Sequence, residues 1–112
     1  MIRHKYFQLD FADSSYERLE MNGKTLTVYL TSWDAKTLRI VFFHPIRLSY
    51  NTGSFPENIF EIQGGSPFLQ DTITAYYEKI PQNHPFKHFQ IIDIEDFPFI
   101  EIVAEGAQGF KE

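Results

Sequence analysis

The feature that most constrains the fold is a hairpin signal in the first third of the chain. Residues 16–21 and 24–31 both alternate between apolar and polar side chains, and Asn22-Gly23 lies between them. A period of two places the apolar side chains of a strand on one face. Asn-Gly favours a type I′ turn, which needs positive φ at both central residues. The sequence therefore predicts an antiparallel hairpin with one buried face.

Similar patterns predict further strands over residues 6–11, 38–43, 46–50, 87–94 and 99–104. The run 38–43 is apolar at every position except Arg39, which is typical of a central strand covered on both sides. His44-Pro45 ends this run, because proline cannot donate to a strand ladder. Residues 106–109 contain two glycines and predict a frayed tail.

One helix is predicted over residues 66–79. Ser66 is a favoured N-cap and Pro67 a favoured first helical residue, and Pro81 ends the segment. An apolar stripe at helical spacing consists of Phe68, Leu69, Ile73, Tyr76, Tyr77 and Ile80. Residues 51–65, just before the helix, are rich in turn formers and predict a long loop with a short strand, at most, over 59–62.

These elements follow the order β-β-β-β-α-β-β. They predict a single α+β domain over residues 1–112, with one antiparallel β-sheet and one helix packed on one face. The chain has 112 residues, 43% of them hydrophobic, which is enough for one core. The lack of cysteine excludes a disulfide scaffold, a cysteine zinc site and a thiol nucleophile. With no 18-residue apolar run and no signal segment, we expect a cytoplasmic protein that does not span a membrane.

Charge is divided unevenly along the chain. Residues 1–56 carry seven Lys and Arg against five Asp and Glu, and residues 57–112 carry three against ten. An acidic half repels phosphates, so this division disfavours nucleic-acid binding and favours a basic protein partner. An alternative interpretation is that the acidic residues only keep an aromatic-rich domain soluble.

Histidines and carboxylates are the candidates for chemistry. His84 and His88 are four residues apart, but Pro85 makes a helical metal motif improbable, and no His-Glu-x-x-His sequence occurs. Close carboxylates over residues 93–105 can do acid–base work or bind a metal, yet no spacing matches a metal motif. The sequence therefore predicts no catalytic residue, no metal ligand and no cofactor, and we interpret the chain as non-enzymatic.

A protein-binding surface is the leading hypothesis. Aromatic side chains in loops are typical interface anchors, and carboxylates steer a basic partner toward its site. A solvated acidic edge that discourages strand aggregation is the alternative interpretation. The residues that we expect to bind the partner are Trp33, Phe55, Asp93, Glu95, Asp96, Phe97 and Glu101.

Two stretches of the sequence resemble a group of known proteins. Residues 26–34 with 38–42 form a strand pattern around a Trp-Asp turn, and residues 88–104 form an acidic final hairpin. Together they resemble small uncharacterised bacterial proteins, some of which look like immunity proteins of polymorphic toxin systems. The resemblance implies a non-enzymatic inhibitor of one toxin domain, often a basic nuclease.

Two alternatives to this function stay open. One is a structural or self-associating domain, such as a homodimer formed through a sheet edge or a sheet face. The other is a metal-dependent or acid–base enzyme that uses His84, His88 and the carboxylates.

Overall fold

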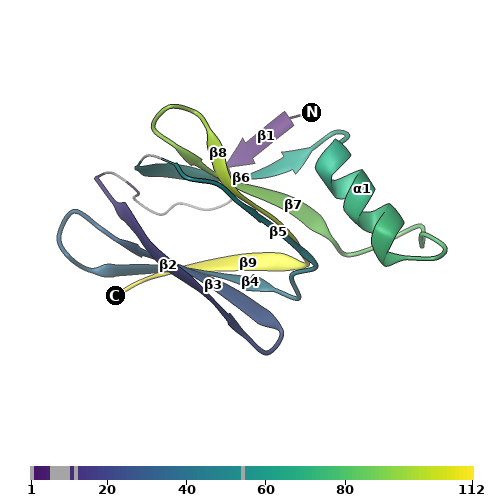
Figure 1. The fold of residues 1–112 in the computed structure, drawn as a ribbon, viewed down its shortest axis with the longest axis horizontal. Helices are drawn as coiled ribbons and strands as arrows, with labels where there is room; N and C mark the ends of the chain where they lie inside the picture. Colours follow the sequence, from purple (N-terminus) through teal and green to yellow (C-terminus); the bar gives the residue numbers. More distant parts are fainter. Residues whose placement is uncertain (1, 6–10, 12, 54) are drawn as a thin grey trace.

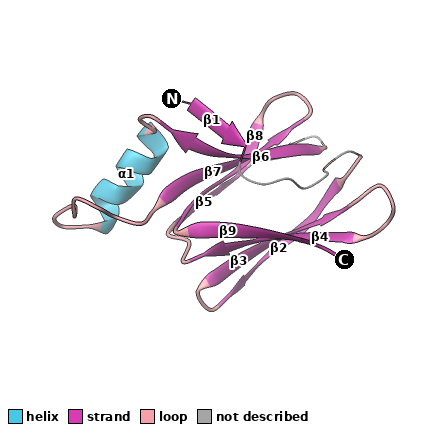
Figure 2. Ribbon diagram, turned by 180° about the vertical axis from the view of Figure 1, so that it is seen from behind, coloured by secondary structure: helices cyan, strands magenta, loops and turns pink. Residues whose placement is uncertain are grey.

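The chain folds into two antiparallel β-sheets that face each other, with one helix on the outside (Figures 1 and 2). This computed structural model describes residues 2–5, 11, 13–53 and 55–112. The elements in these ranges are β1 Ile2–Lys5, β2 Ser15–Asn22, β3 Thr25–Thr31, β4 Thr37–Phe43, β5 Arg47–Tyr50, β6 Pro56–Gln63, α1 Pro67–Tyr76, β7 Lys87–Asp93, β8 Pro98–Ala104 and β9 Gly106–Lys111. The five-stranded sheet has the order β1-β6-β7-β8-β5, and the four-stranded sheet has the order β2-β3-β4-β9.

Two sheets replace the single sheet that the sequence predicts, although the antiparallel pairing and the one helix on an outer face are confirmed. Each sheet has one strongly apolar face, and the two apolar faces bury each other. Phe42 from β4 meets Phe89 from β7 across this interface, with ring centroids 5.6 Å apart. The largest side chains of the shared core are Phe42, Phe89, Phe99, Leu26, Leu30, Leu38, Ile40, Ile59, Ile91, Ile100 and Ile102.

Strand β4 is covered on one face, so the prediction of a strand covered on both sides is wrong. Leu38, Ile40 and Phe42 point into the core and are fully buried, while Arg39 and Phe43 on the opposite face are exposed. The outer face of the four-stranded sheet is covered locally by side chains of its own. The Arg39 guanidinium, for example, lies 4.8 Å from the centre of the Phe110 ring on β9.

A bent ribbon joins the two sheets. Strands β4 and β9 pair in one sheet, and their continuations β5 and β8 pair in the other. Two backbone hydrogen bonds carry the pairing around the corner: Glu105 N–H donates to the Phe43 carbonyl at 2.9 Å, and Ile46 N–H donates to the Val103 carbonyl at 2.8 Å. His44, with φ of 49°, forms the bend on one strand. The predicted break at His44-Pro45 and the strand that follows it are confirmed.

The glycine-rich tail is part of the sheet, contrary to the prediction that it frays. Strand β9 pairs with β4 over its whole length, with Ala107 opposite Phe42 and Gly109 opposite Ile40. Small residues at these positions leave room for the large side chains of β4, and Ala107 is itself buried.

The predicted hairpin is confirmed, with its turn displaced by one residue. Asn22 pairs with Thr25, so the two turn residues are Gly23 and Lys24. Gly23 occupies the first central position of the turn and has a positive φ of 61°. A positive φ at this position is typical of a type II′ turn.

Helix α1 covers the outer face of the five-stranded sheet. Its Ser66 N-cap is confirmed, since the hydroxyl accepts a hydrogen bond of 3.1 Å from the Leu69 N–H. The helix ends at Tyr76 rather than near residue 79, because Tyr77 adopts an extended conformation. As a result Ile80, the last residue of the predicted stripe, is 47% exposed.

The predicted long loop over residues 51–65 is mostly strand. Strand β6 occupies most of this range and pairs with β1 on one side and with β7 on the other. The sequence did not predict β6 as a long strand, because polar residues such as Glu57, Asn58 and Glu61 interrupt its apolar pattern. The strand predicted over residues 6–11 lies largely outside the described residues. Phe11 is the one residue of this range that the structure describes, and it belongs to the core.

Gly53 lies directly on the Phe99 ring, which gives a test of the packing between the β5–β6 connection and the core. A Cβ at this position would lie 2.5 Å from Phe99 Cγ. We expect Gly53→Ala to lower the free energy of unfolding by about 1–3 kcal/mol, measured by urea denaturation, because overpacking displaces the loop or the ring.

The double variant Gly53→Ala/Phe99→Leu supplies the control. The smaller side chain relieves the clash, so the two substitutions together should cost less than the sum of the separate costs. If the losses in unfolding free energy of the two single variants add exactly in the double variant, the contact between Gly53 and the Phe99 ring is contradicted.

Candidate protein-binding surface

Large apolar side chains are exposed on three connections at one end of the molecule. These connections are 32–36 between β3 and β4, the described residues 51–53 and 55 between β5 and β6, and 94–97 between β7 and β8. They lie toward one end of the long axis (Figures 1 and 2). We call this region the loop end. Its exposed apolar side chains are Trp33, 65% exposed, Phe55, 57%, Ile94, 58%, and Phe97, 42%.

The turn that presents Trp33 is closed by hydrogen bonds. Ser32 N–H donates to the Lys36 carbonyl at 2.8 Å, and the Ser32 hydroxyl bonds to the Asp34 carboxylate. This hydroxyl, with a smaller contribution from Lys111, holds the pKa of Asp34 below its usual range. Asp34 therefore remains ionised and braces the turn, leaving Trp33 free to project.

The turn between β7 and β8 is built around a buried carboxylate. Asp93 Oδ1 accepts hydrogen bonds from Glu95 N–H at 2.9 Å and from Phe97 N–H at 3.0 Å. Asp96, with φ of 63°, forms the tip of the turn. Asp93 is 2% exposed. Its expected place on the partner-binding surface is therefore corrected: it shapes the turn that carries the other residues.

Backbone contacts hold the other two connections together. Ile94 N–H donates to the Phe55 carbonyl at 3.0 Å, so the connections 51–55 and 94–97 are joined directly. Asn51 N–H donates to the Phe99 carbonyl at 2.8 Å, which anchors the start of the first of them. The backbones of Phe55 and Ile94 are consequently adjacent.

The acidic residues that the sequence predicts fall into two places. Glu95 and Asp96 are exposed at the loop end, and Asp96 pairs with Arg3 of β1 at 2.5 Å. Glu101 lies in β8, on the outer face of the five-stranded sheet, where it accepts hydrogen bonds from the side chains of His88 and Gln90. It is thus apart from the loop end, because residue 101 occupies the middle of a strand rather than a turn.

A buried polar network ties helix α1 to the sheet beneath it. His88 Nδ1 lies 2.6 Å from the Ser66 hydroxyl, and His88 Nε2 lies 2.9 Å from Glu101 Oε1. The Phe68 ring stacks on the imidazole with centroids 4.6 Å apart. A neutral imidazole with its proton on Nε2 satisfies every contact, since it donates to Glu101 and accepts from the Ser66 hydroxyl.

The charge state of His88 follows from this position. Burial lowers the pKa of His88, and although Glu101 opposes the shift, burial is the larger effect. Ser66 and His88 are each 2% exposed, and the serine hydroxyl already caps the helix. The group therefore has the geometry of a structural tether, not of an exposed nucleophile and base.

The two histidines that the sequence pairs serve different contacts. His84 Nδ1 accepts a hydrogen bond from Phe86 N–H at 3.2 Å in the loop before β7, while His88 lies beneath the helix. Across the described ranges, no three His, Asp or Glu side chains are arranged to hold a metal ion.

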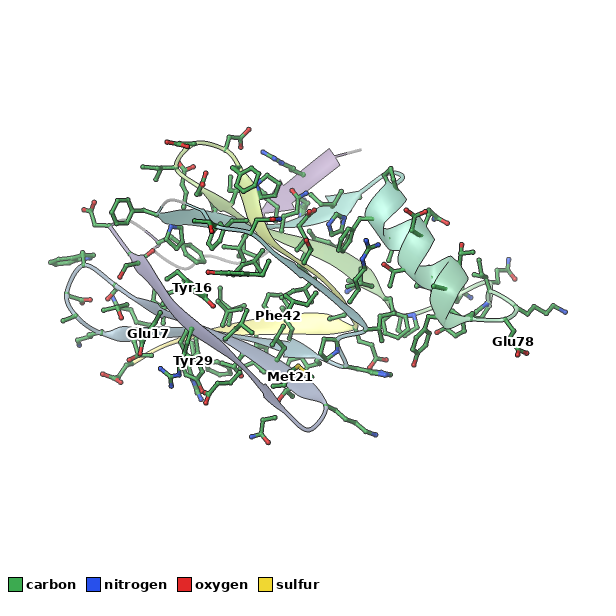
Figure 3. The ribbon with its side chains drawn as sticks, viewed as in Figure 1. Tyr16, Glu17, Met21, Tyr29, Phe42 and Glu78 are labelled. Atoms are coloured by element: carbon green, nitrogen blue, oxygen red, sulfur yellow. The ribbon has the colours of Figure 1, made fainter. Side chains whose placement is uncertain are left out.

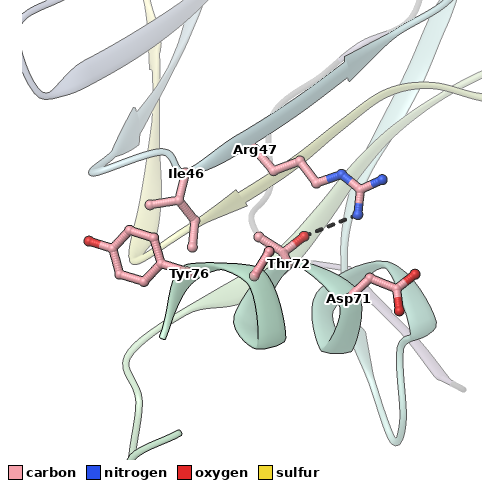
Figure 4. Close-up of a pocket in the computed structure, with 6 residues that line it drawn as sticks. Ile46, Arg47, Asp71, Thr72 and Tyr76 are labelled. Carbon is pink, nitrogen blue, oxygen red and sulfur yellow. Dashed lines mark hydrogen bonds between the residues drawn. The ribbon is translucent and has the colours of Figure 1, made fainter. Parts of the chain in front are cut away.

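A shallow pocket lies beside the helix (Figure 4). Its cation, Arg47, donates to Thr72 Oγ1 at 3.2 Å and to the Phe68 carbonyl at 3.3 Å, and it lies 3.9 Å from the centre of the Phe68 ring. These contacts engage the guanidinium in holding the helix, so it is a poor anchor for a ligand.

Sequence reasoning missed two parts of this description. Ile94 belongs to a predicted strand. In the structure it lies in the turn built around Asp93, where its side chain is exposed to solvent. The His88–Glu101 contact joins two strands that the sequence predicts without their register. For the network of Ser66, His88 and Glu101, the one local signal in the sequence was Ser66 as a predicted helix N-cap.

Comparisons with protein-family models, with curated proteins and with solved structures find no match to this chain. Within the described residues, no helix is both long and apolar enough to cross a bilayer.

The buried state of His88 predicts a loss of stability in mild acid. Because its pKa in the folded protein is lowered from 6.5, the unfolded chain binds more protons at this residue once the pH falls below that value. The contribution of neutral His88 is therefore fully present above 6.5 and is lost as the pH falls. We expect His88→Gln to flatten the dependence of unfolding free energy on pH between about pH 7 and about pH 5.

His84→Gln is the matched control, since it removes a histidine outside the network. The unfolding free energy of His84→Gln should depend on pH as that of the wild type does over the same pH range. Equal slopes for the wild type and His88→Gln would contradict the assignment of the effect to His88.

Proposed function

We propose that this protein is a non-enzymatic binding domain that recognises a partner protein through its loop end. The observation that supports the proposal is the gathering of four exposed apolar side chains on three connections at one end of the molecule. Large aromatic side chains on ordered loops lose little conformational entropy when they are buried, and they dominate the energetics of many interfaces. Trp33, Phe55 and Phe97 are the proposed anchors.

The charges around these anchors favour a basic partner. Glu95 and Asp96 directly precede Phe97, and both are exposed. Such exposed carboxylates act mainly on the rate of association, since solvent screens their contribution to affinity. A basic toxin domain, which the resemblance to immunity proteins implies as the partner, has this chemistry.

Three of the four edges of the described sheets argue against strand pairing between copies as the main function. Strands β1 and β5, at the two edges of the five-stranded sheet, have four residues each. The long edge strand β2 carries Glu17, Arg18 and Glu20. Short or charged edges are the usual protection against strand-to-strand pairing between copies.

Substitution of the anchors tests the proposal. The partner is first isolated by affinity capture on the full chain from lysate of the native cells, and its binding is then measured by surface plasmon resonance. We expect Trp33→Ala and Phe97→Ala each to weaken binding by about 10–100-fold, because central aromatic residues contribute most to such interfaces.

Phe110→Ala is the matched control, because Phe110 is 40% exposed on the outer face of the four-stranded sheet. It should leave the affinity unchanged. Equal effects of Phe110→Ala and Phe97→Ala, or the absence of any captured partner at low salt, would count against the loop end. Glu95→Lys should slow association more than it speeds dissociation.

A further inference from the structure

Helix α1 packs on a hydrophobic cluster of its own. Among the described residues, this cluster shares no buried side chain with the core between the two sheets. Phe42 marks that core and lies between the sheets, whereas the helix lies outside them (Figure 3). The helix can therefore leave the five-stranded sheet without opening the core. The buried members of the helix cluster are Ile73, Phe86 and Val103, and Ile46, Phe68, Leu69 and Tyr77 pack around them.

The two connections of the helix allow it to move. Gly64 and Gly65, with φ of 75° and 90°, lie between β6 and the N-cap, and glycine changes its backbone conformation at little steric cost. Residues 77–86 join the helix to β7 without a further helix or strand, and most of them are exposed. Because an isolated helix of ten residues is marginal in water, α1 depends on its contacts with the sheet.

Those contacts require a neutral His88. In the docked helix the Ser66 hydroxyl donates to His88 Nδ1 at 2.6 Å and accepts from the Leu69 N–H at 3.1 Å. An imidazolium carries a proton on both nitrogens, so Nδ1 can no longer accept. The hydrogen of the buried Ser66 hydroxyl then loses its acceptor, and a charge is added where water is excluded. Protonation of His88 therefore weakens the contact that holds the N-terminus of the helix.

The charged groups around His88 do not reverse this preference. Glu101 of β8, 2.9 Å from Nε2, favours the charged form, and Arg47 of β5 opposes it. The residue of β6 opposite His88 is the uncharged Ile62. Asp71, the charged residue of α1, lines the pocket beside Arg47. Burial is the largest effect, and it lowers the pKa of His88.

The sign of the pH dependence follows from this burial. Release of the helix returns the His88 imidazole to water, where its pKa rises toward 6.5. Below this pH the released state binds more protons than the docked state. The stability that neutral His88 gives to docking is therefore present above 6.5 and is lost as the pH falls.

We propose that α1 is an acid-released cover: when His88 takes up a proton, the helix leaves the outer face of the five-stranded sheet while the two-sheet core stays folded. The release uncovers Ile46 and Val103, which the helix cluster otherwise buries or partly buries. A local opening of this kind precedes global unfolding. The inference does not depend on the loop end, because none of the proposed anchors contacts the helix cluster.

Hydrogen exchange of the full chain, followed by NMR, tests the release. Rates are compared as protection factors, because the intrinsic exchange rate itself changes with pH. We expect the protection factors of the α1 amides to be about tenfold or more below those of the hydrogen-bonded amides of β3 and β4. Between about pH 7.5 and about pH 5.5, the protection of α1 should fall by about three- to tenfold. Low concentrations of urea should not change it, because a local opening exposes little surface.

Three variants separate the titrating group from the packing of the helix. His88→Gln keeps an uncharged polar side chain beneath the helix, so the protection of α1 should lose most of its pH dependence. His84→Gln, outside the network, should keep that dependence. Ile73→Ala removes a buried side chain of the helix without changing a titrating group. It should lower the protection of α1 at both pH values while the dispersed amide signals of β3 and β4 persist.

Three outcomes would overturn the proposal. Equal protection factors for α1 and β3 at the lower pH would mean that the helix and the core open together. Protection of α1 that is independent of pH in the wild type, or that changes equally in His88→Gln, would mean that His88 does not control release. Loss of the folded β3 and β4 signals in Ile73→Ala would mean that the core requires the docked helix.

Discussion

The face-to-face packing of two sheets is the constraint on which the rest of the molecule depends, and the bent ribbon sets its geometry. Strands β4 and β9 continue into β5 and β8, so one hydrogen-bonded ladder belongs to both sheets and fixes where each lies. The bend is closed by side chains as well as backbone, since His44 Nδ1 lies 3.0 Å from Glu105 Oε2. Tyr76, at the end of the helix, lies 3.4 Å from the other nitrogen of this imidazole, so the corner also positions α1.

The proposed binding surface lies where this packing stops. The helix covers part of the outer face of the five-stranded sheet, and its contacts through Ser66 and Arg47 are made within the chain. The loop end instead leaves apolar side chains in water, on connections joined by a backbone hydrogen bond from Ile94 N–H to the Phe55 carbonyl. Rigid presentation reduces the entropy lost on association, so such positions contribute more to binding than equally apolar residues on loose segments.

Local signals in the sequence were sufficient for the elements that local chemistry determines. The hairpin at Gly23, the N-cap at Ser66 and the bend after β4 were all predicted from a few neighbouring residues. Predictions were wrong where pairing partners far along the chain decide the outcome. Strand β6 is polar enough to resemble a loop until β1 and β7 bond to both its edges, and the glycines of β9 resemble a frayed tail until β4 is opposite them. The second sheet follows from the same cause, because alternation identifies a buried face without identifying what buries it.

The same reasoning changes the meaning of the acidic half of the chain. Its carboxylates do not form one acidic face, since their roles depend on whether each lies in a turn, on a strand face or at a corner. Asp93 builds a turn, Glu101 holds a buried histidine, and Glu105 closes the bend. At the turn between β7 and β8, Glu95 and Asp96 are exposed and available to a partner, and the latter already contacts Arg3. So few exposed charges can raise the rate of encounter at the loop end, but they supply little of the affinity. Affinity at this surface must therefore come from the aromatic side chains beside them.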